Sequence, residues 1–287
     1  MKIGILMLRS SATRRGSIIS DVIRSLSEWG ASVDVIYPEE QLVKLSQVRV
    51  EHDLYILKSR TDMALSLAGA LHAVGAAILN PYPVAAMLRD KIFMNRMLQA
   101  AGVSTPDTYV TAHPDLLGPL LEEGPLVIKP YRGSGTGVHV VWDVDELDDV
   151  PTNRGPVFVQ RYQERENSDC KIYSIGGQLF GVRRKWPART HEEKAGEAVT
   201  LTPELRDLAT RCGRAFGLEM YGVTVIESNG RAYAVDVSSF PGFKGVPDAA
   251  LRLADYIYAA GQRAMKGEPL LAAPEKIRRE ISQCAPS

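Results

Sequence analysis

The chain has 287 residues, 45% of them hydrophobic and 24% charged, a composition typical of a globular protein that excludes a disordered or fibrous one. Lysine plus arginine balance aspartate plus glutamate at 34 each, so we expect neither a nucleic acid nor a membrane as partner. The three cysteines and five histidines lack metal-ligand spacing, and no stretch approaches the roughly 20 apolar residues of a transmembrane helix. We therefore expect a cytoplasmic protein.

Residues 1–88 alternate apolar runs with helical patterns. Between the runs, a helix is predicted from Ser17 to Gly30, and a second helix over residues 62–74. The runs predict buried strands: "KIGILML", "SVDVIY", "DLYIL" and "AAILN". This order of strands and helices is typical of a parallel sheet covered by helices, and hence of an α/β lobe.

From residue 89 the pattern changes. A short helix begins near Asp90, and shorter β segments joined by tight turns follow it, with the hairpin signals "GG" at 176–177 and "NG" at 229–230. Thr202 followed by a proline predicts a helix start, and a last long helix is predicted around Leu253. The fold class is therefore α/β with α+β lobes, and we expect residues 267–287 to form a loosely held tail.

The segment "VIKPYRGSGTGV", residues 127–138, places Lys129 at the end of a strand, ahead of a loop with three glycines. Glycine lets backbone N–H groups approach an anion, so such a loop can hold phosphate. A strand follows the loop, whereas the Walker and dinucleotide-binding loops open a helix, and on pattern alone a plain hairpin turn stays open. Asp236 and Ser238 lie two apart in a later strand and so share one face, as oxygen ligands of Mg²⁺ would.

The order of these motifs resembles that of the ATP-grasp superfamily over nearly the whole chain, and it is most similar to the RimK-like ligases and the inositol polyphosphate (trisphosphate 5/6) kinases. The likeness to the kinases rests on "LKSRTD", "CKIYSIGG" and "DVSSFPGFKGV". The resemblance implies an ATP-grasp fold with a substrate lobe at residues 1–88, a central subdomain with the glycine loop at 89–162, and a C-terminal subdomain with a metal site at 163–266. The two subdomains would sandwich ATP.

The resemblance also implies roles for single residues, with ATP and Mg²⁺ as cofactors. Lys91 and Lys129 would contact the ATP phosphates, and Lys171 and Arg184 would act as catalytic residues on the transferred phosphoryl group. Asp236 and Ser238 would hold Mg²⁺. The other nucleotide contacts would come from the glycine loop, the adenine-binding hinge and a ribose contact: Gly133, Ser134, Gly135, Thr136, Gly137, Gln160, Arg161, Tyr162, Gln163 and Asp169.

The chain departs from the family pattern at the metal site. Thr224 stands where the family has a carboxylate, and Ser238 stands where the family has an asparagine. Neutral oxygens bind Mg²⁺ far less well than carboxylates do. Either one metal binds weakly, or Glu227 or the substrate supplies the missing charge, or the protein binds ATP without turning it over.

Cations cluster after the predicted strands of the first lobe and beyond the hairpin "GG", which predicts an anionic small-molecule substrate. We expect the substrate contacts to be Arg14, Lys58, Arg60, His139, Arg183 and Gly242. The alternatives are a solvated loop for "RRKWPARTHEEK", a half-buried strand residue for His139 and a surface lysine for Lys91.

The leading interpretation is a kinase that moves the γ-phosphoryl group of ATP to an inositol-like or phosphorylated polyol. The first alternative is a RimK-like carboxylate–amine ligase that acts through an acyl phosphate. The second is a regulator that binds ATP without turnover. The sequence leaves a homodimer open.

Overall fold

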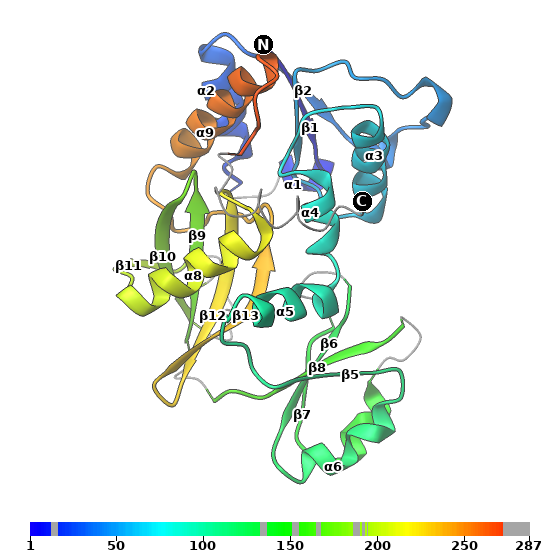
Figure 1. Cartoon of the computed structure of the whole chain (residues 1–287), viewed down its shortest axis with the longest axis vertical. Coiled ribbons are helices and arrows are strands. Elements are labelled where there is room, and N and C mark those ends of the chain that lie inside the picture. Colours follow the sequence, from blue (N-terminus) through cyan, green and yellow to red (C-terminus); the bar gives the residue numbers. More distant parts are fainter. Residues whose placement is uncertain are drawn as a thin grey trace, which may run out of the picture.

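The computed structural model describes residues 1–12, 17–132, 137–150, 155–164, 168–185, 190, 193 and 195–271. The strands form three sheets, which follow one another along the chain (Figure 1). No helix within these ranges is long and apolar enough to cross a membrane. The predicted α/β fold class is confirmed, because a parallel sheet is followed by two antiparallel ones.

The first sheet is parallel, with the strand order β2-β1-β3-β4. Its strands are β1 (Lys2–Leu6), β2 (Ser32–Ile36), β3 (Leu54–Leu57) and β4 (Ile78–Leu79), and its helices are α1 (Arg9–Ala12), α2 (Ile19–Glu28), α3 (Asp62–Ala73) and α4 (Tyr82–Met87). Ile3 and Ile5 pack with α2 on one face, whereas Leu6 packs with α3 on the other. Helices on both faces explain why β1 and β3 are continuous apolar runs.

The second sheet is antiparallel, with the strand order β5-β8-β6-β7. Its strands are β5 (Thr108–Thr111), β6 (Leu126–Pro130), β7 (His139–Val141) and β8 (Val157–Arg161), and α6 (Gly118–Leu121) lies beside them. Helix α5 (Lys91–Ala100) leads into this sheet, and the Asp90 carboxylate caps it by accepting hydrogen bonds from the N–H groups of Ile92 and Phe93. One face of the sheet is buried under Leu117, Leu121 and Leu147.

The third sheet is also antiparallel, with the strand order β11-β10-β9-β12-β13. Its strands are β9 (Ser168–Ile175), β10 (Gln178–Lys185), β11 (Glu197–Val199), β12 (Tyr221–Ser228) and β13 (Arg231–Ser238). Both predicted hairpins are confirmed, β9–β10 at Gly176–Gly177 and β12–β13 at Asn229–Gly230. Helix α8 (Pro203–Phe216) covers one face and is capped by Thr202, as predicted.

Helix α9 (Ala249–Met265) returns to the first sheet and packs beside α2 (Figure 1). Its buried residues Leu253 and Ile257 share one apolar core with Ile3 and Leu26. The last part of the chain therefore closes onto the first lobe. Short 3-10 turns complete the described structure at Pro38–Glu40, Leu45–Gln47, Pro114–Leu117 and Asp145–Asp149. Residues 272–287 of the predicted tail lie outside the described residues.

Candidate active site

Lys129, at the end of β6, joins the second sheet to the third. Its ammonium group donates a hydrogen bond to Gln160 Oε1 at 2.8 Å and another to the carbonyl of Val235 on β13 at 3.4 Å. Gln160, on β8, is paired with Val127, which lies two residues before Lys129 on β6. Lys129 and Gln160 therefore lie on the same face of the second sheet. This face of the second sheet therefore looks toward the third sheet.

The same face carries exposed apolar side chains on the edge strand β7 and its continuation. Val140 is paired with Val127, which in turn is paired with Gln160. Trp142 follows two residues later, is 59% exposed, and has its ring centroid 5.5 Å from that of Tyr162. An exposed apolar surface with two aromatic rings beside a lysine is suited to an aromatic base attached to phosphates.

Opposite this surface, a row of three side chains crosses the third sheet. Thr224 on β12 is paired with Lys171 on β9 and with Asp236 on β13, so the three side chains lie on one face. The Lys171 ammonium donates a hydrogen bond of 2.6 Å to the Thr224 hydroxyl. Burial lowers the pKa of Lys171 to about 8, against the opposing attraction of Asp236.

Two further cations converge on Asp236 from other elements. Lys91, in the first turn of α5, is buried, and its ammonium group donates to the carbonyl of Pro130 at 3.0 Å. Burial lowers the pKa of Lys91, and the charge of Asp236 acts in the opposite direction. Arg60, which follows β3, also interacts electrostatically with Asp236. The three parts of the chain thus contribute to one cationic region around a single carboxylate.

The Asp169 carboxylate and the Arg184 guanidinium, predicted as a ribose contact and a phosphoryl contact, are bound to each other. Arg184 Nε lies 2.8 Å from Asp169 Oδ1, and Nη2 lies 2.7 Å from Oδ2. Asp169 is two residues from Lys171 along β9, so the pair lies on the same face as the row just described. In this structure Arg184 neutralises a buried carboxylate.

This arrangement agrees with a family comparison. The model of the RimK-like ATP-grasp domain family matches residues 88–259. The chain belongs to this family. A probable alpha-L-glutamate ligase from Marinomonas sp. (strain MWYL1) is 27% identical over 191 residues, which cover 61% of this chain and 64% of the relative. Another, from Methanococcoides burtonii, is 25% identical over 224 residues, which cover 71% of this chain and 74% of the relative. The chain thus spans less than two thirds of the first of these relatives.

Solved structures with low sequence identity share the fold. A RimK domain ATP-grasp protein from Sphaerobacter thermophilus has a TM-score of 0.73 at 21% identity, covering 90% of this chain and 100% of that one. A D-alanine–D-alanine ligase from Bacillus anthracis has a TM-score of 0.74 at 20% identity, covering 94% and 100%. The ATP-grasp ligase PsnB in complex with a minimal precursor has a TM-score of 0.67 at 20% identity, covering 90% and 98%.

The predicted ATP-grasp fold and RimK-like resemblance are confirmed by these matches. The predicted resemblance to inositol polyphosphate kinases is not shown. The kinase was our leading interpretation, and the matches favour the ligase that we gave as the alternative, because the matching family is RimK-like and the named relatives are ligases.

Two predicted contacts, Arg161 for the nucleotide and Arg183 for the anionic substrate, have their side chains on the far faces of their strands. Arg161 donates to the carbonyls of Leu120 and Gly124 and pairs with Glu123, on the face opposite Gln160. Arg183 lies next to Arg184 on β10 and so points to the other face of the third sheet, where it lies 3.4 Å from a carboxylate oxygen of Glu227. Their guanidinium groups do not join the cationic region around Asp236.

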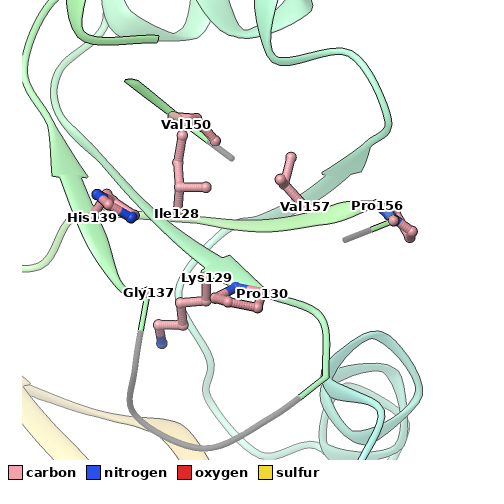
Figure 2. Close-up of a pocket in the computed structure, with 9 residues that line it drawn as sticks. Ile128, Lys129, Pro130, Gly137, His139, Val150, Pro156 and Val157 are labelled. Carbon is pink, nitrogen blue, oxygen red and sulfur yellow. The ribbon is translucent and has the colours of Figure 1, made fainter. Parts of the chain in front are cut away.

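His139 also lies away from Lys129. It is paired with Ile128, the neighbour of Lys129, and therefore shares the opposite face of the second sheet. His139 and Lys129 are both among the residues that line a small, mainly apolar pocket, but Figure 2 shows the Lys129 side chain pointing away from Ile128 and Val150. The structure thus agrees with the alternative of a half-buried strand residue.

Lys58, predicted as a substrate contact, holds two lobes together. Its ammonium group donates to the carbonyls of Phe240 and Pro241 at 3.3 and 3.2 Å, in the loop after β13. Asn80, at the end of β4, was not found from the sequence, and it also connects the first lobe to the third sheet. Its amide nitrogen donates to the carbonyls of Met220 and Ser239 at 2.6 and 2.5 Å. No local pattern marked this asparagine, because its partners lie more than a hundred residues away.

From the sequence, Trp142 was expected to pack in a core or a lid rather than to stack on a base, yet it is 59% exposed. Gly242 lies exposed in the loop after β13. Tyr162 lies on the apolar surface beside Trp142, and Gln163 follows it in the chain, whereas Gly137 lines the small pocket that also contains Lys129 and His139. Arg14, Gly133, Ser134, Gly135 and Thr136 fall outside the described residues, so their predicted roles stay predictions.

The predicted Mg²⁺ site has few suitable donors. Asp236 and Ser238 share one face of β13, but Ser238 is a buried neutral hydroxyl. Within the described ranges, no group of three or more histidine, cysteine, aspartate or glutamate side chains could hold a metal ion. These residues do not fit a site in which the protein alone holds Mg²⁺, and we assign no reaction step to the ion.

Proposed function

We propose that this protein is an ATP-dependent ligase that joins a carboxylate to an amine through an acyl phosphate. The observation that carries the proposal is the RimK-like ATP-grasp match over residues 88–259, which contain Lys91, Lys129, Lys171 and Asp236. The cationic region around Asp236 supports it, because ATP and a carboxylate are both anionic.

The reaction has two steps. In the first, an oxygen of the substrate carboxylate attacks the γ-phosphorus of ATP, the bond to the β-phosphate oxygen breaks, and ADP leaves. In the second, the neutral amine attacks the acyl carbon, the bond between that carbon and the phosphate oxygen breaks, and phosphate and a proton leave. Fixed cations speed phosphoryl transfer by positioning the oxygens and neutralising their charge.

The side chains near the interface of the second and third sheets divide into two groups. We assign the ATP phosphates to the ammonium groups of Lys91, Lys129 and Lys171, which three separate elements bring toward the same interface. We assign the adenine ring to the apolar surface that carries Trp142 and Tyr162. The phosphates would then lie at the lysine end of that surface and the base at the tryptophan end.

Arg60 is our candidate for the substrate carboxylate. Its side chain is exposed and, within the described part of the chain, has neither a hydrogen bond nor an ion pair, although it interacts electrostatically with Asp236. A guanidinium group can hold a carboxylate through two parallel hydrogen bonds. The relatives named alpha-L-glutamate ligases suggest L-glutamate as one substrate, and the PsnB complex with its precursor suggests a peptide as the other.

Product analysis tests the proposal. The protein is incubated with ATP, Mg²⁺, L-glutamate and a panel of amino acids and peptides, and product masses, ADP and free phosphate are measured. We expect a condensed product with one ADP and one phosphate released per bond formed. Hydroxylamine in place of the amine should give a hydroxamate, which reports the acyl phosphate.

Two other results would contradict the ligase. A product heavier by one phosphoryl group without free phosphate would identify a kinase, and nucleotide binding without turnover over a broad panel would identify a regulator. Lys129→Ala should lower turnover by at least about a hundredfold, because it removes charge-assisted hydrogen bonds from the phosphates. The matched control is Lys266→Ala, which removes an exposed lysine at the end of α9 and should leave turnover unchanged.

A further inference from the structure

The row of Lys171, Thr224 and Asp236 departs from what a metal-dependent phosphate site needs. The three residues are neighbours across β9, β12 and β13, and the central position is a neutral hydroxyl that already accepts a hydrogen bond from the Lys171 ammonium at 2.6 Å. The position next to Asp236 is thus occupied by a lysine–threonine pair. A second carboxylate, which would draw a divalent cation to Asp236, is absent from this row.

The charges around Asp236 add up to an excess of cations. Arg60, Lys91 and Lys171 all interact electrostatically with this one carboxylate. The nearest other acid on the same face along β9, Asp169, is already neutralised by Arg184. A divalent cation placed beside Asp236 would therefore be attracted by one charge and repelled by three.

The same excess favours a polyanion. Metal-free ATP or ADP is more negative than its magnesium complex by the charge of one Mg²⁺, and it leaves all its phosphate oxygens available to N–H donors. Each charge-assisted hydrogen bond from an ammonium or guanidinium group contributes roughly 1.5–3 kcal/mol when both partners are held in place. Ammonium and guanidinium groups can thus supply the neutralisation that a bound Mg²⁺ would otherwise supply.

We propose that this site binds the polyphosphate of ATP or ADP without needing a divalent cation, because Lys91, Lys129 and Lys171 take over its charge and Thr224 holds Lys171 beside Asp236. The inference rests on the nucleotide site of the proposed function. It concerns binding, and it holds whether or not the chemical step later uses Mg²⁺ carried in by the nucleotide.

Calorimetric titration of the full chain with ADP tests the inference, once in excess Mg²⁺ and once in excess EDTA. We expect the two dissociation constants to agree within about threefold, because the protein's own cations neutralise the phosphates. A loss of affinity of about thirtyfold or more in EDTA would overturn the inference but leave the ligase proposal standing. Absence of ADP binding in both buffers would overturn the inference and the nucleotide site together.

Substitutions at Thr224 sharpen the test. Thr224→Asp adds a carboxylate beside Asp236, and we expect EDTA to weaken ADP binding to this variant by about tenfold or more. Thr224→Asn adds an amide of nearly the same size without charge, and its ADP binding should stay insensitive to EDTA. A loss of ADP affinity in EDTA that is as large for the wild-type chain as for Thr224→Asp, about tenfold or more, would overturn the inference.

A direct measurement covers the case in which Thr224→Asp does not fold. Free Mn²⁺ is counted by electron paramagnetic resonance in the presence of the wild-type protein without nucleotide. We expect the free Mn²⁺ signal to match that of buffer. A loss of signal that saturates at one ion per chain, and that Asp236→Asn abolishes, would overturn the inference.

Discussion

The guanidinium of Arg184 on β10 holds the carboxylate of Asp169 on β9 through two parallel hydrogen bonds of 2.8 and 2.7 Å. The Asp169 side chain is 4% exposed and the Arg184 side chain 26% exposed. Because a buried carboxylate is costly without its partner, Arg184→Ala should lower the free energy of unfolding by about 3 kcal/mol. Urea unfolding followed by circular dichroism measures the loss.

The neighbouring arginine is the control for this prediction. Arg183 points to the other face and has a half-exposed contact of 3.4 Å with Glu227. Arg183→Ala should therefore change the free energy of unfolding by less than about 1 kcal/mol. If Arg184→Ala and Arg183→Ala lowered the free energy of unfolding equally, the buried Asp169–Arg184 pair would contribute no more to stability than an exposed ion pair.

The lowered pKa of Lys171 predicts a dependence of ADP affinity on pH. Burial brings this pKa to about 8 from the ordinary 10.5, so the ammonium loses its proton as the pH rises through about 8. We expect ADP affinity to fall by about tenfold between about pH 7 and pH 9, because one charged donor is lost. Lys171→Arg keeps its charge in this range, and its affinity should stay level; a parallel fall in both proteins would assign the effect to another group.

The same pKa predicts how stability changes with pH. Between about 8 and 10.5 the unfolded chain keeps the Lys171 proton that the folded chain has released, so the unfolded state binds more protons. The contribution of Lys171 to the free energy of unfolding should therefore rise with pH across this window. It is measured as the difference between wild-type and Lys171→Met unfolding curves, and a difference that falls with pH would contradict the prediction.

The exposed indole of Trp142 predicts a binding effect without a stability effect. Trp142→Ala should weaken ADP binding by about tenfold, because stacking of a base on an aromatic ring contributes about 1–3 kcal/mol. The melting temperature should hardly change, since the side chain is 59% exposed. Trp29→Ala, on the first lobe where Trp29 contacts Tyr258, is the matched control and should leave ADP affinity unchanged.

The two hydrogen bonds that the Asn80 amide nitrogen donates predict that substitutions of Asn80 destabilise the fold. The amide nitrogen donates to the carbonyls of Met220 and Ser239, so Asn80→Ala should lower the free energy of unfolding by about 2–3 kcal/mol. Asn80→Asp should be worse at neutral pH, because a carboxylate would face two carbonyl oxygens. Equal or better stability of Asn80→Asp in a thermal melt would contradict the assigned amide orientation.

Much of the local structure followed from short patterns. The Asn229–Gly230 hairpin forms because both residues adopt the positive φ that this turn needs, at 50° and 71°. The helix after Thr202 begins at the predicted proline. The Thr202 hydroxyl accepts a hydrogen bond from the N–H group of Leu205, which has no acceptor within the first turn of the helix. Phe93 is an exception: its helical spacing matches that of the buried Met94 and Leu98 on α5, yet Phe93 is 42% exposed.

The candidate site was predicted only in part. Lys129 and Asp236 were found from their order along the chain, and the structure brings their strands within hydrogen-bonding range. Arg161, Arg183 and His139 also lie close to the predicted motifs in sequence, but they point to the far faces of their strands. A cluster of cations in a sequence does not say which of them share a face.

The sequence by itself determined most of the strands, the longer helices, the two hairpins and the order of motifs that is typical of an ATP-grasp chain, because each depends on residues near one another in the sequence, but it did not mark the short elements α1, α4, α6 and β11. Only the tertiary structure decided which side chains meet. A strand's alternation divides its residues into two sets, but helices and strands from distant parts of the chain determine which set is covered. Lys171 and Arg184 therefore share a face with Thr224 and Asp236, whereas Arg183 and His139 do not.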